Sequence, residues 1–167
     1  MTIPQRVTLI DVGPRDGLQN EKQPVATADK IELVHRLQLA GLREIEVTSY
    51  VSPKWVPQMA DNADVMRGIK RQAGVRYSVL VPNVQGLQAA LAADALPDEV
   101  VVFAAASEAF SRNNINCSID ESIERFAPVV AQARAAGLKV RGAVSTVVGC
   151  PYEGDVSPDR VEHVVRR

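Results

Sequence analysis

The sequence predicts an α/β fold built on a parallel sheet, and two observations support this. Short apolar segments rich in β-branched residues alternate with longer segments whose apolar residues recur at helical spacing. The short segments start roughly 25 to 40 residues apart, which leaves room for a crossover helix between each pair. Strands that are apolar along most of their length are typical of sheets covered on both faces. The expected strands are residues 7–12, 44–48, 77–81, 100–104 and 139–144.

Several helix ends can be recognised between these strands. Thr27 is expected to cap a helix that stops at Gly41. Ser118 and Glu121 have the spacing of a capping box at the start of a second helix. Ser157 stands directly before a proline, which is typical of an N-cap followed by the first helical residue.

Two architectures fit this alternation of strands and helices: an open doubly wound sheet and a (β/α)₈ barrel. No GxGxxG motif follows the first strand, so the dinucleotide-binding version of the open sheet has no support. A complete barrel usually takes about 250 residues, whereas five strands fit into the 167 residues of this chain. If the fold is a barrel, we therefore expect residues 1–167 to be one partial domain of about five βα units, truncated at its carboxyl end.

Composition excludes several classes of protein. Hydrophobic residues make up 46% of the chain and charged residues 23%, with a formal net charge of −1, as in ordinary globular proteins. No basic patch of the kind that binds nucleic acid stands out, and no apolar run approaches the roughly 20 residues of a membrane span. The N-terminus lacks the apolar region of a secretory signal. Cys117 and Cys150 show no CxxC spacing and are expected to be free thiols, so we expect a cytoplasmic protein.

The first candidate site follows the first strand, where Arg15 and Asp16 stand side by side in a turn with Pro14 and two glycines. Arginine offers a permanent, forked positive charge that suits an enolate or carboxylate oxygen. Aspartate offers a hard oxygen ligand for a divalent cation. An ordinary loop salt bridge would also explain such a pair, although the surrounding glycines and proline predict a shaped turn.

The second candidate is Glu46, which lies inside an otherwise apolar strand. Charged groups are rarely buried unless they are paired or bind a metal. Glu46 could therefore pair with Arg15 and orient it, or hold a metal-bound water. Glu44 shares its face of the strand but lies at the strand's entry, where an edge or solvated charge is expected.

Three loop segments follow later strands. Trp55 is expected to pack as a cover over the end of the sheet, and Lys54 is a weak candidate for a phosphate contact. Residues 107–117 are rich in amides, which suits either a polar ligand or simple turns. Cys150 is expected to be structural because no basic neighbour stands beside it.

Together these segments resemble 3-hydroxy-3-methylglutaryl-CoA lyases from about residue 7 to the end of the chain. The Arg-Asp turn and the strand glutamate are shared by a wider group of metal-dependent barrel lyases and acyltransferases. Four longer strings favour the lyase: Gly-Leu-Gln-Asn-Glu, Glu-Val-Thr-Ser-Tyr-Val-Ser-Pro-Lys-Trp-Val-Pro-Gln-Met, Asn-Asn-Ile-Asn-Cys-Ser-Ile and Gly-Cys-Pro-Tyr-Glu-Gly.

The resemblance implies a TIM barrel that cleaves 3-hydroxy-3-methylglutaryl-CoA to acetyl-CoA and acetoacetate with Mg²⁺ or Mn²⁺. It implies that Asp16 is a metal ligand and that an acyl-CoA is the substrate. The family's H-x-H metal ligands, further asparagine ligand and acid/base cysteine do not occur in these 167 residues. We therefore expect the chain alone to be inactive and to bind metal poorly. The implied catalytic residues are Arg15 and Glu46, and the implied substrate-binding residues are Arg15, Gln19, Ser49 and Asn113.

Two other interpretations stay open. A Claisen-type acyl-CoA synthase of the same superfamily would use the same enolate, and only the longer strings favour cleavage over condensation. A non-catalytic partial barrel, completed by self-association or by a partner chain, would also fit five strands. Since many such barrels associate, a homo-oligomer is a further expectation.

Overall fold

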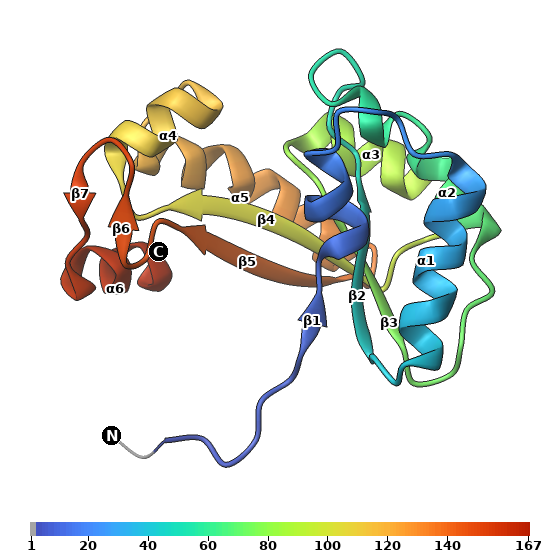
Figure 1. The fold of residues 1–167 in the computed structure, drawn as a ribbon. Coiled ribbons are helices and arrows are strands. Elements are labelled where there is room, and N and C mark those ends of the chain that lie inside the picture. Colours follow the sequence, from blue (N-terminus) through green and yellow to red (C-terminus); the bar gives the residue numbers. More distant parts are fainter. Residues whose placement is uncertain (1–2) are drawn as a thin grey trace.

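A computed structural model describes residues 3–167, and it contains a five-stranded parallel sheet in the order β1-β2-β3-β4-β5. The predicted α/β class and parallel pairing are confirmed. Each strand lies beside the next one in sequence, so every connection between them is a crossover on the same side of the sheet (Figure 1). The strands are Ile10–Asp11 (β1), Glu44–Ser49 (β2), Arg76–Leu80 (β3), Glu99–Ala105 (β4) and Lys139–Ser145 (β5).

The first strand is much shorter than the sequence predicts. Only two residues of the expected 7–12 segment pair with β2. Before them, Val7 and Leu9 are 76% and 70% exposed, so the apolar pattern that predicts a strand has no neighbour to pack against here. The other four strands start within one residue of their predicted positions.

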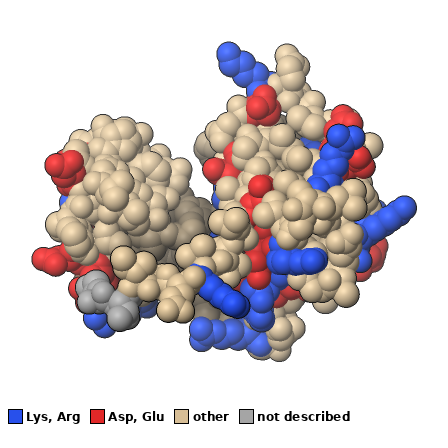
Figure 2. Space-filling model, turned by 60° about the horizontal axis from the view of Figure 1, so that its bottom comes forward, with Lys and Arg blue, Asp and Glu red and all other residues tan. Residues whose placement is uncertain are grey.

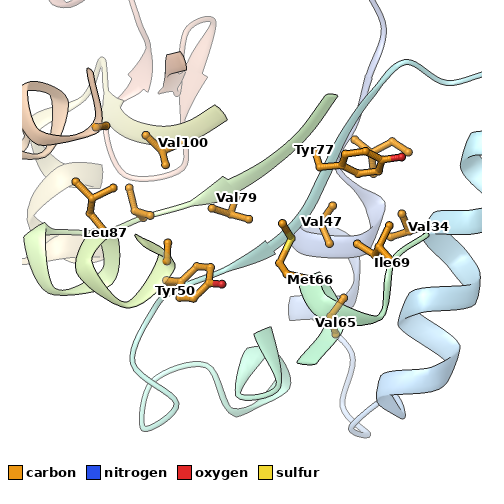
Figure 3. Packing of buried hydrophobic residues seen from close by; sticks show 14 of the residues in the cluster. Val34, Val47, Tyr50, Val65, Met66, Ile69, Tyr77, Val79, Leu87 and Val100 are labelled. Carbon is orange, nitrogen blue, oxygen red and sulfur yellow. The ribbon is translucent and has the colours of Figure 1, made fainter. Parts of the chain in front are cut away.

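Helices cover one face of the sheet and enclose the main core. Apolar side chains of β2, β3 and β4 meet side chains of α1, α2, α3 and α5 there, and Figure 3 shows Val47, Val79 and Val100 turned toward this layer. Several of these side chains are fully buried, among them Val34 and Leu87 from the helices. The helices are Thr27–Leu39 (α1), Asn62–Gly68 (α2), Val84–Ala92 (α3), Glu108–Ile115 (α4), Ile119–Ala135 (α5) and Pro158–Arg166 (α6).

Most of the predicted helix ends are present. The Ser118 hydroxyl accepts a hydrogen bond from the Glu121 backbone N–H (3.1 Å), and the Glu121 carboxylate accepts one from the Ser118 N–H (2.7 Å), which confirms the capping box. Ser157 caps α6. Gly41 follows α1 with φ +91°, the left-handed conformation that favours glycine. Thr27 as an N-cap was wrong, because it is the first helical residue and its hydroxyl instead donates to an Asp61 carboxylate oxygen at 2.7 Å.

Two segments outside the predicted strands and helices contain regular structure. Residues 108–115 form α4, because the hydroxyl of Ser107 accepts from the Phe110 N–H at 3.1 Å and caps the helix. After β5, the strands Gly149–Cys150 (β6) and Gly154–Asp155 (β7) pair as a short antiparallel hairpin. With α4 and α6, this hairpin lies at one end of β4 and β5, away from β1 (Figure 1).

The surface carries both signs of charge. Figure 2 shows acidic and basic side chains intermixed on one face, with the charged groups denser on one side of a hollow than on the other. Within residues 3–167, no helix is long and apolar enough to cross a membrane.

Candidate active site at the carboxyl ends of the strands

The Arg15-Asp16 pair lies in an unusual turn, a single π-helical segment over Gly13–Gly17 (η1) directly after β1. The carbonyl of Val12 accepts hydrogen bonds from the N–H of Asp16 at 2.7 Å and of Gly17 at 3.4 Å. Turns of this wide type are rare and are found frequently at functional sites. The turn sets the two charged side chains at the carboxyl end of the first strand, where a barrel fold forms its sites.

Neighbouring side chains hold the turn in shape. The Gly13 N–H donates to the Asp11 carboxylate at 2.9 Å, and the Asn20 side chain donates to the Asp16 carbonyl at 2.7 Å. A Cβ on Gly13 would stand 3.0 Å from the Asp11 oxygen, so this position suits glycine. Pro14, which is part of the turn, is buried. The predicted shaped turn is therefore present and held at both ends.

Arg15 and Glu46 form the ion pair that the sequence suggests. Arg15 Nε donates to Glu46 Oε1 at 2.6 Å, and the Glu46 side chain is only 1% exposed. Arg15 Nη1 donates to Asp16 Oδ1 at 2.7 Å, so the local salt bridge exists as well. Asp16 is 54% exposed, whereas Arg15 is 15% exposed. The structure thus brings Arg15, Asp16 and Glu46 together, with Asp16 on the open side.

Arg141 on β5 completes this cluster, and the sequence reasoning missed it. Its Nη2 donates to Glu46 Oε2 at 2.8 Å and to the Ser78 hydroxyl at 3.3 Å, while its Nε donates to Glu99 Oε2 at 3.0 Å. The signal that singled out Glu46 was available here too, because Arg141 is a charged residue within a mostly apolar strand. Burial lowers the pKa of Arg141, but the hydrogen bonds and charges of Glu46 and Glu99 outweigh burial and raise it above its ordinary value.

Two further predicted residues lie near the cluster. Ser49 ends β2 and is fully buried, and its hydroxyl has no hydrogen-bond partner within residues 3–167. Gln19 is half-buried in the turn directly after η1. Both positions are at the same end of the sheet as Arg15, so their predicted contact with a substrate stays a prediction compatible with the fold.

Asn113 is not brought to this cluster. It lies exposed on α4, where its side-chain amide donates to the Ala109 carbonyl of its own helix at 2.9 Å. In Figure 1, α4 lies at the upper left, apart from β1 near the middle of the view. Trp55 does not pack as a cover, because its side chain is 84% exposed on the loop after β2.

The remaining predicted groups take structural roles. Glu44 forms an ion pair with Arg76 at 2.9 Å at the amino end of β2, away from Arg15. Both cysteines are free thiols, as expected, and both are buried. Burial raises the pKa of the Cys150 thiol, but hydrogen bonds from the Ser107 hydroxyl and from backbone N–H groups outweigh it and lower the pKa overall.

The described residues contain no group of three or more His, Cys, Asp or Glu side chains that could hold a metal ion. Asp16 is a single hard oxygen donor, and its Oδ1 is already paired with Arg15. This donor set fits a divalent cation only in part: Asp16 could contribute one ligand.

The geometry has a direct chemical consequence. Arg15 uses Nε and Nη1 in its ion pairs, and its Nη2 group donates no hydrogen bond in the described part of the chain. A guanidinium that is held through two of its three nitrogens can present the third to a negatively charged oxygen in a set direction.

Comparison with known proteins gives a consistent result. Residues 6–167 match the model of the HMGL-like family. A Pseudomonas aeruginosa protein named 3-hydroxy-3-isohexenylglutaryl-CoA/hydroxymethylglutaryl-CoA lyase is 58% identical over 99% of this chain and 55% of its own length. The mitochondrial hydroxymethylglutaryl-CoA lyase of Bos taurus is 57% identical over 99% of this chain and 50% of its own. The chain thus spans about half the length of the curated relatives it matches.

Solved structures agree with these relatives. The hydroxymethylglutaryl-CoA lyase of Pseudomonas aeruginosa superimposes with a TM-score of 0.93, covering 99% of this chain and 55% of that one at 58% identity. An HMG-CoA lyase from Acinetobacter baumannii, solved with coenzyme A and 3-methylmalate, gives a TM-score of 0.87 at 34% identity, with 95% and 51% covered. The five parallel strands therefore correspond to about half of a lyase barrel.

Proposed function

Since the chain belongs to the HMGL-like family, we propose that it forms the Arg15 part of the active site of a lyase that cleaves 3-hydroxy-3-methylglutaryl-CoA to acetyl-CoA and acetoacetate. The observation that carries the proposal is the buried Glu46, whose carboxylate fixes Arg15 at the carboxyl end of the sheet. The names of the relatives support cleavage of this substrate over condensation by a synthase.

The reaction needs a place for negative charge. The bond between C2 and C3 of the substrate breaks after the tertiary hydroxyl loses its proton. The electron pair of that bond then passes to the thioester carbonyl as the enolate of acetyl-CoA, which takes up a proton at carbon. Arg15, with its free Nη2 group, is suited to donate hydrogen bonds to the enolate oxygen. Donors that are oriented before the reaction stabilise such charge most effectively.

A divalent cation, Mg²⁺ or Mn²⁺, is part of the proposal. Asp16 is half-exposed beside Arg15 and would supply one carboxylate ligand. When bound, the cation would act as a Lewis acid on the substrate's oxygens. Arg15 Nη1 donates a hydrogen bond to Asp16 Oδ1 at 2.7 Å and so directs the carboxylate.

Substrate contacts are proposed for the polar side chains at the same end of the sheet. Ser49 has a buried hydroxyl without a partner in the described residues, so a ligand oxygen could satisfy it. Gln19 lies two residues after the end of the turn that contains Arg15, so its side chain is a second candidate for contact with the substrate. Asn113 is the weakest member of the set because its amide already bonds within α4.

Location remains a prediction. The curated relatives include lyases named cytoplasmic in Mus musculus and Rattus norvegicus, and lyases named mitochondrial in Bos taurus and also in Rattus norvegicus. We propose the cytoplasm, because the two lyases named cytoplasmic are each 57% identical to this chain over 99% of its length.

Product analysis tests the function. The protein expressed from its complete reading frame is incubated with 3-hydroxy-3-methylglutaryl-CoA and Mg²⁺, and acetoacetate and acetyl-CoA are measured. We expect equal amounts of both products. Condensation of acetyl-CoA with an oxo acid that releases free coenzyme A, without cleavage of 3-hydroxy-3-methylglutaryl-CoA, would favour a synthase. The absence of both reactions would refute the proposal.

A further inference from the structure

A continuous line of ion pairs crosses the face of the sheet opposite the helices. It runs from Asp16 through Arg15, Glu46 and Arg141 to Glu99, and every step is a hydrogen bond between 2.6 and 3.0 Å. The line joins the turn after β1 to strands β2, β5 and β4. The proposed function uses only its first three members.

Strand alternation explains why these charges meet. Val47, Val79 and Val100 point toward the helices, so the intervening residues of the same strands point to the other face. Glu46, Glu99 and Arg141 occupy such positions, with Ser78 between them on β3.

Arg141 determines what Glu46 can do. Glu46 is buried, and each of its two oxygens already accepts a hydrogen bond from an arginine. Of the two roles that its sequence position allowed, pairing with Arg15 is the one whose contact is present in the described residues. Glu46 holds Arg15 through a single bond from Arg15 Nε.

Arg141 is itself held from two sides. Its Nε is bound by Glu99, which is 9% exposed, and the Ser78 hydroxyl accepts a second hydrogen bond from Nη2. A planar guanidinium can satisfy two carboxylates at fixed angles, whereas the point charge of a lysine cannot reproduce this fork. Arg141 thus sets the position of the Glu46 carboxylate.

We propose that Arg141 is a positioning residue of the lyase site, which acts through Glu46 to direct the Nη2 group of Arg15 toward the enolate oxygen. This inference rests on the proposed function for its catalytic part. Arg141 is not expected to touch the substrate. Without Arg141, one Glu46 oxygen loses its partner, and the carboxylate can turn away from Arg15.

The chain offers a matched control in Arg76. Arg76 also bridges neighbouring strands to a glutamate of β2, since its Nη1 lies 2.9 Å from Glu44. That pair is at the amino end of the sheet, whereas Arg15 is at the carboxyl end. Arg76→Met therefore removes an ion pair of the same kind without touching the proposed site.

The experiment compares Arg141→Met, Arg141→Lys and Arg76→Met in the protein expressed from its complete reading frame. Two readouts are used: kcat and KM for 3-hydroxy-3-methylglutaryl-CoA, and the ¹⁵N–¹H signal of Arg15 Nε, assigned by its loss in Arg15→Lys. The NMR signal needs no substrate and reports on the ion pair directly. Arg141→Lys keeps the charge and gives a second variant if Arg141→Met does not fold.

We expect Arg141→Met to lower kcat by about 10- to 100-fold, the scale of a small misplacement of a catalytic group, with KM changed less than about three-fold. The Arg15 Nε signal should shift or broaden. Arg141→Lys should lie between wild type and Arg141→Met, and Arg76→Met should match wild type in both readouts.

An unchanged Arg15 signal in the Arg141 variants would overturn the inference, and so would a changed signal with wild-type kcat. A rise in KM alone would also overturn it, because that result indicates a binding contact. If the wild-type protein cleaves no substrate, the proposed function fails, and the NMR comparison alone then decides whether Arg141 positions Arg15.

Discussion

At the scale of single residues, the site depends on which polar atoms are already bonded. In the described chain, both Glu46 oxygens accept hydrogen bonds, Arg15 Nη2 makes none, and the Ser49 hydroxyl is buried without a partner. A free donor beside fully bonded neighbours marks the place where a ligand can bind. Groups whose hydrogen bonds are already made within the protein hold the site in place, whereas groups without a hydrogen bond are available to a substrate. Residue type alone does not make this distinction.

Ser49 allows a test of that distinction. Removing a buried hydroxyl that has no partner costs little stability, so Ser49→Ala should change the free energy of unfolding by less than about 0.5 kcal/mol. If the hydroxyl binds substrate, KM should rise roughly five-fold, because this factor corresponds to the net free energy of one hydrogen bond. Urea unfolding and steady-state kinetics measure the two effects.

Ser107→Ala is the matched control for this prediction. Ser107 is equally buried, but its hydroxyl is bonded to the Phe110 N–H and caps α4. Loss of the Ser107 hydroxyl should lower the free energy of unfolding by about 1 kcal/mol. Equal destabilisation by Ser49→Ala and Ser107→Ala, with no change in KM for the former, would contradict the assignment of Ser49.

At the scale of elements, helix ends were more predictable than the details of the site. The Ser118–Glu121 box and the Ser157 cap depend on residues three positions apart, so a local pattern contains all the information needed. The prediction of Thr27 as an N-cap was wrong because its hydroxyl donates a hydrogen bond to Asp61, a tertiary partner. The helix over Glu108–Ile115 was missed because serine and asparagine are common both in turns and at helix ends.

The capping box predicts a pH dependence of stability. The hydrogen bond from the Ser118 N–H, with that from the Ser118 hydroxyl, holds the pKa of Glu121 below its ordinary value of 4.5. A carboxyl whose pKa is lower in the folded state stabilises the fold above its unfolded pKa, and this contribution is lost as pH falls through the folded pKa.

Glu121→Gln should therefore lessen the loss of stability on acidification below about pH 4.5, because glutamine keeps the box geometry without a titrating charge. Unfolding free energies measured from pH 7 to pH 3 check this. Glu124→Gln on the same helix is the control and should leave the profile as in wild type. Identical profiles for Glu121→Gln and wild type would argue against the capping box as a source of the pH dependence of stability.

At the scale of the whole molecule, the sheet is an open half of a barrel with β1 and β5 at its edges. The strands from β2 to β5 could be predicted because their apolar pattern depends only on burial between layers. The contact of Glu46 with Arg15 could be expected because consecutive strands lie side by side. The contact with Arg141 could not, since it joins residues 95 positions apart across the curved inner face.

The same inner face explains the central role of Arg15. Helices bury the apolar side of the sheet, and ion pairs occupy part of the other side, where they hold one guanidinium at the open end. The function proposed for the molecule therefore depends on that group more than on any other in these residues.

The most direct test is the turnover of Arg15→Met against Arg76→Met, measured as acetoacetate released from 3-hydroxy-3-methylglutaryl-CoA by the protein from its complete reading frame. Loss of one oriented donor to a developing oxyanion typically costs about 100- to 1000-fold in kcat. We predict a loss of this size for Arg15→Met and wild-type turnover for Arg76→Met. A kcat for Arg15→Met within about three-fold of wild type would contradict the account.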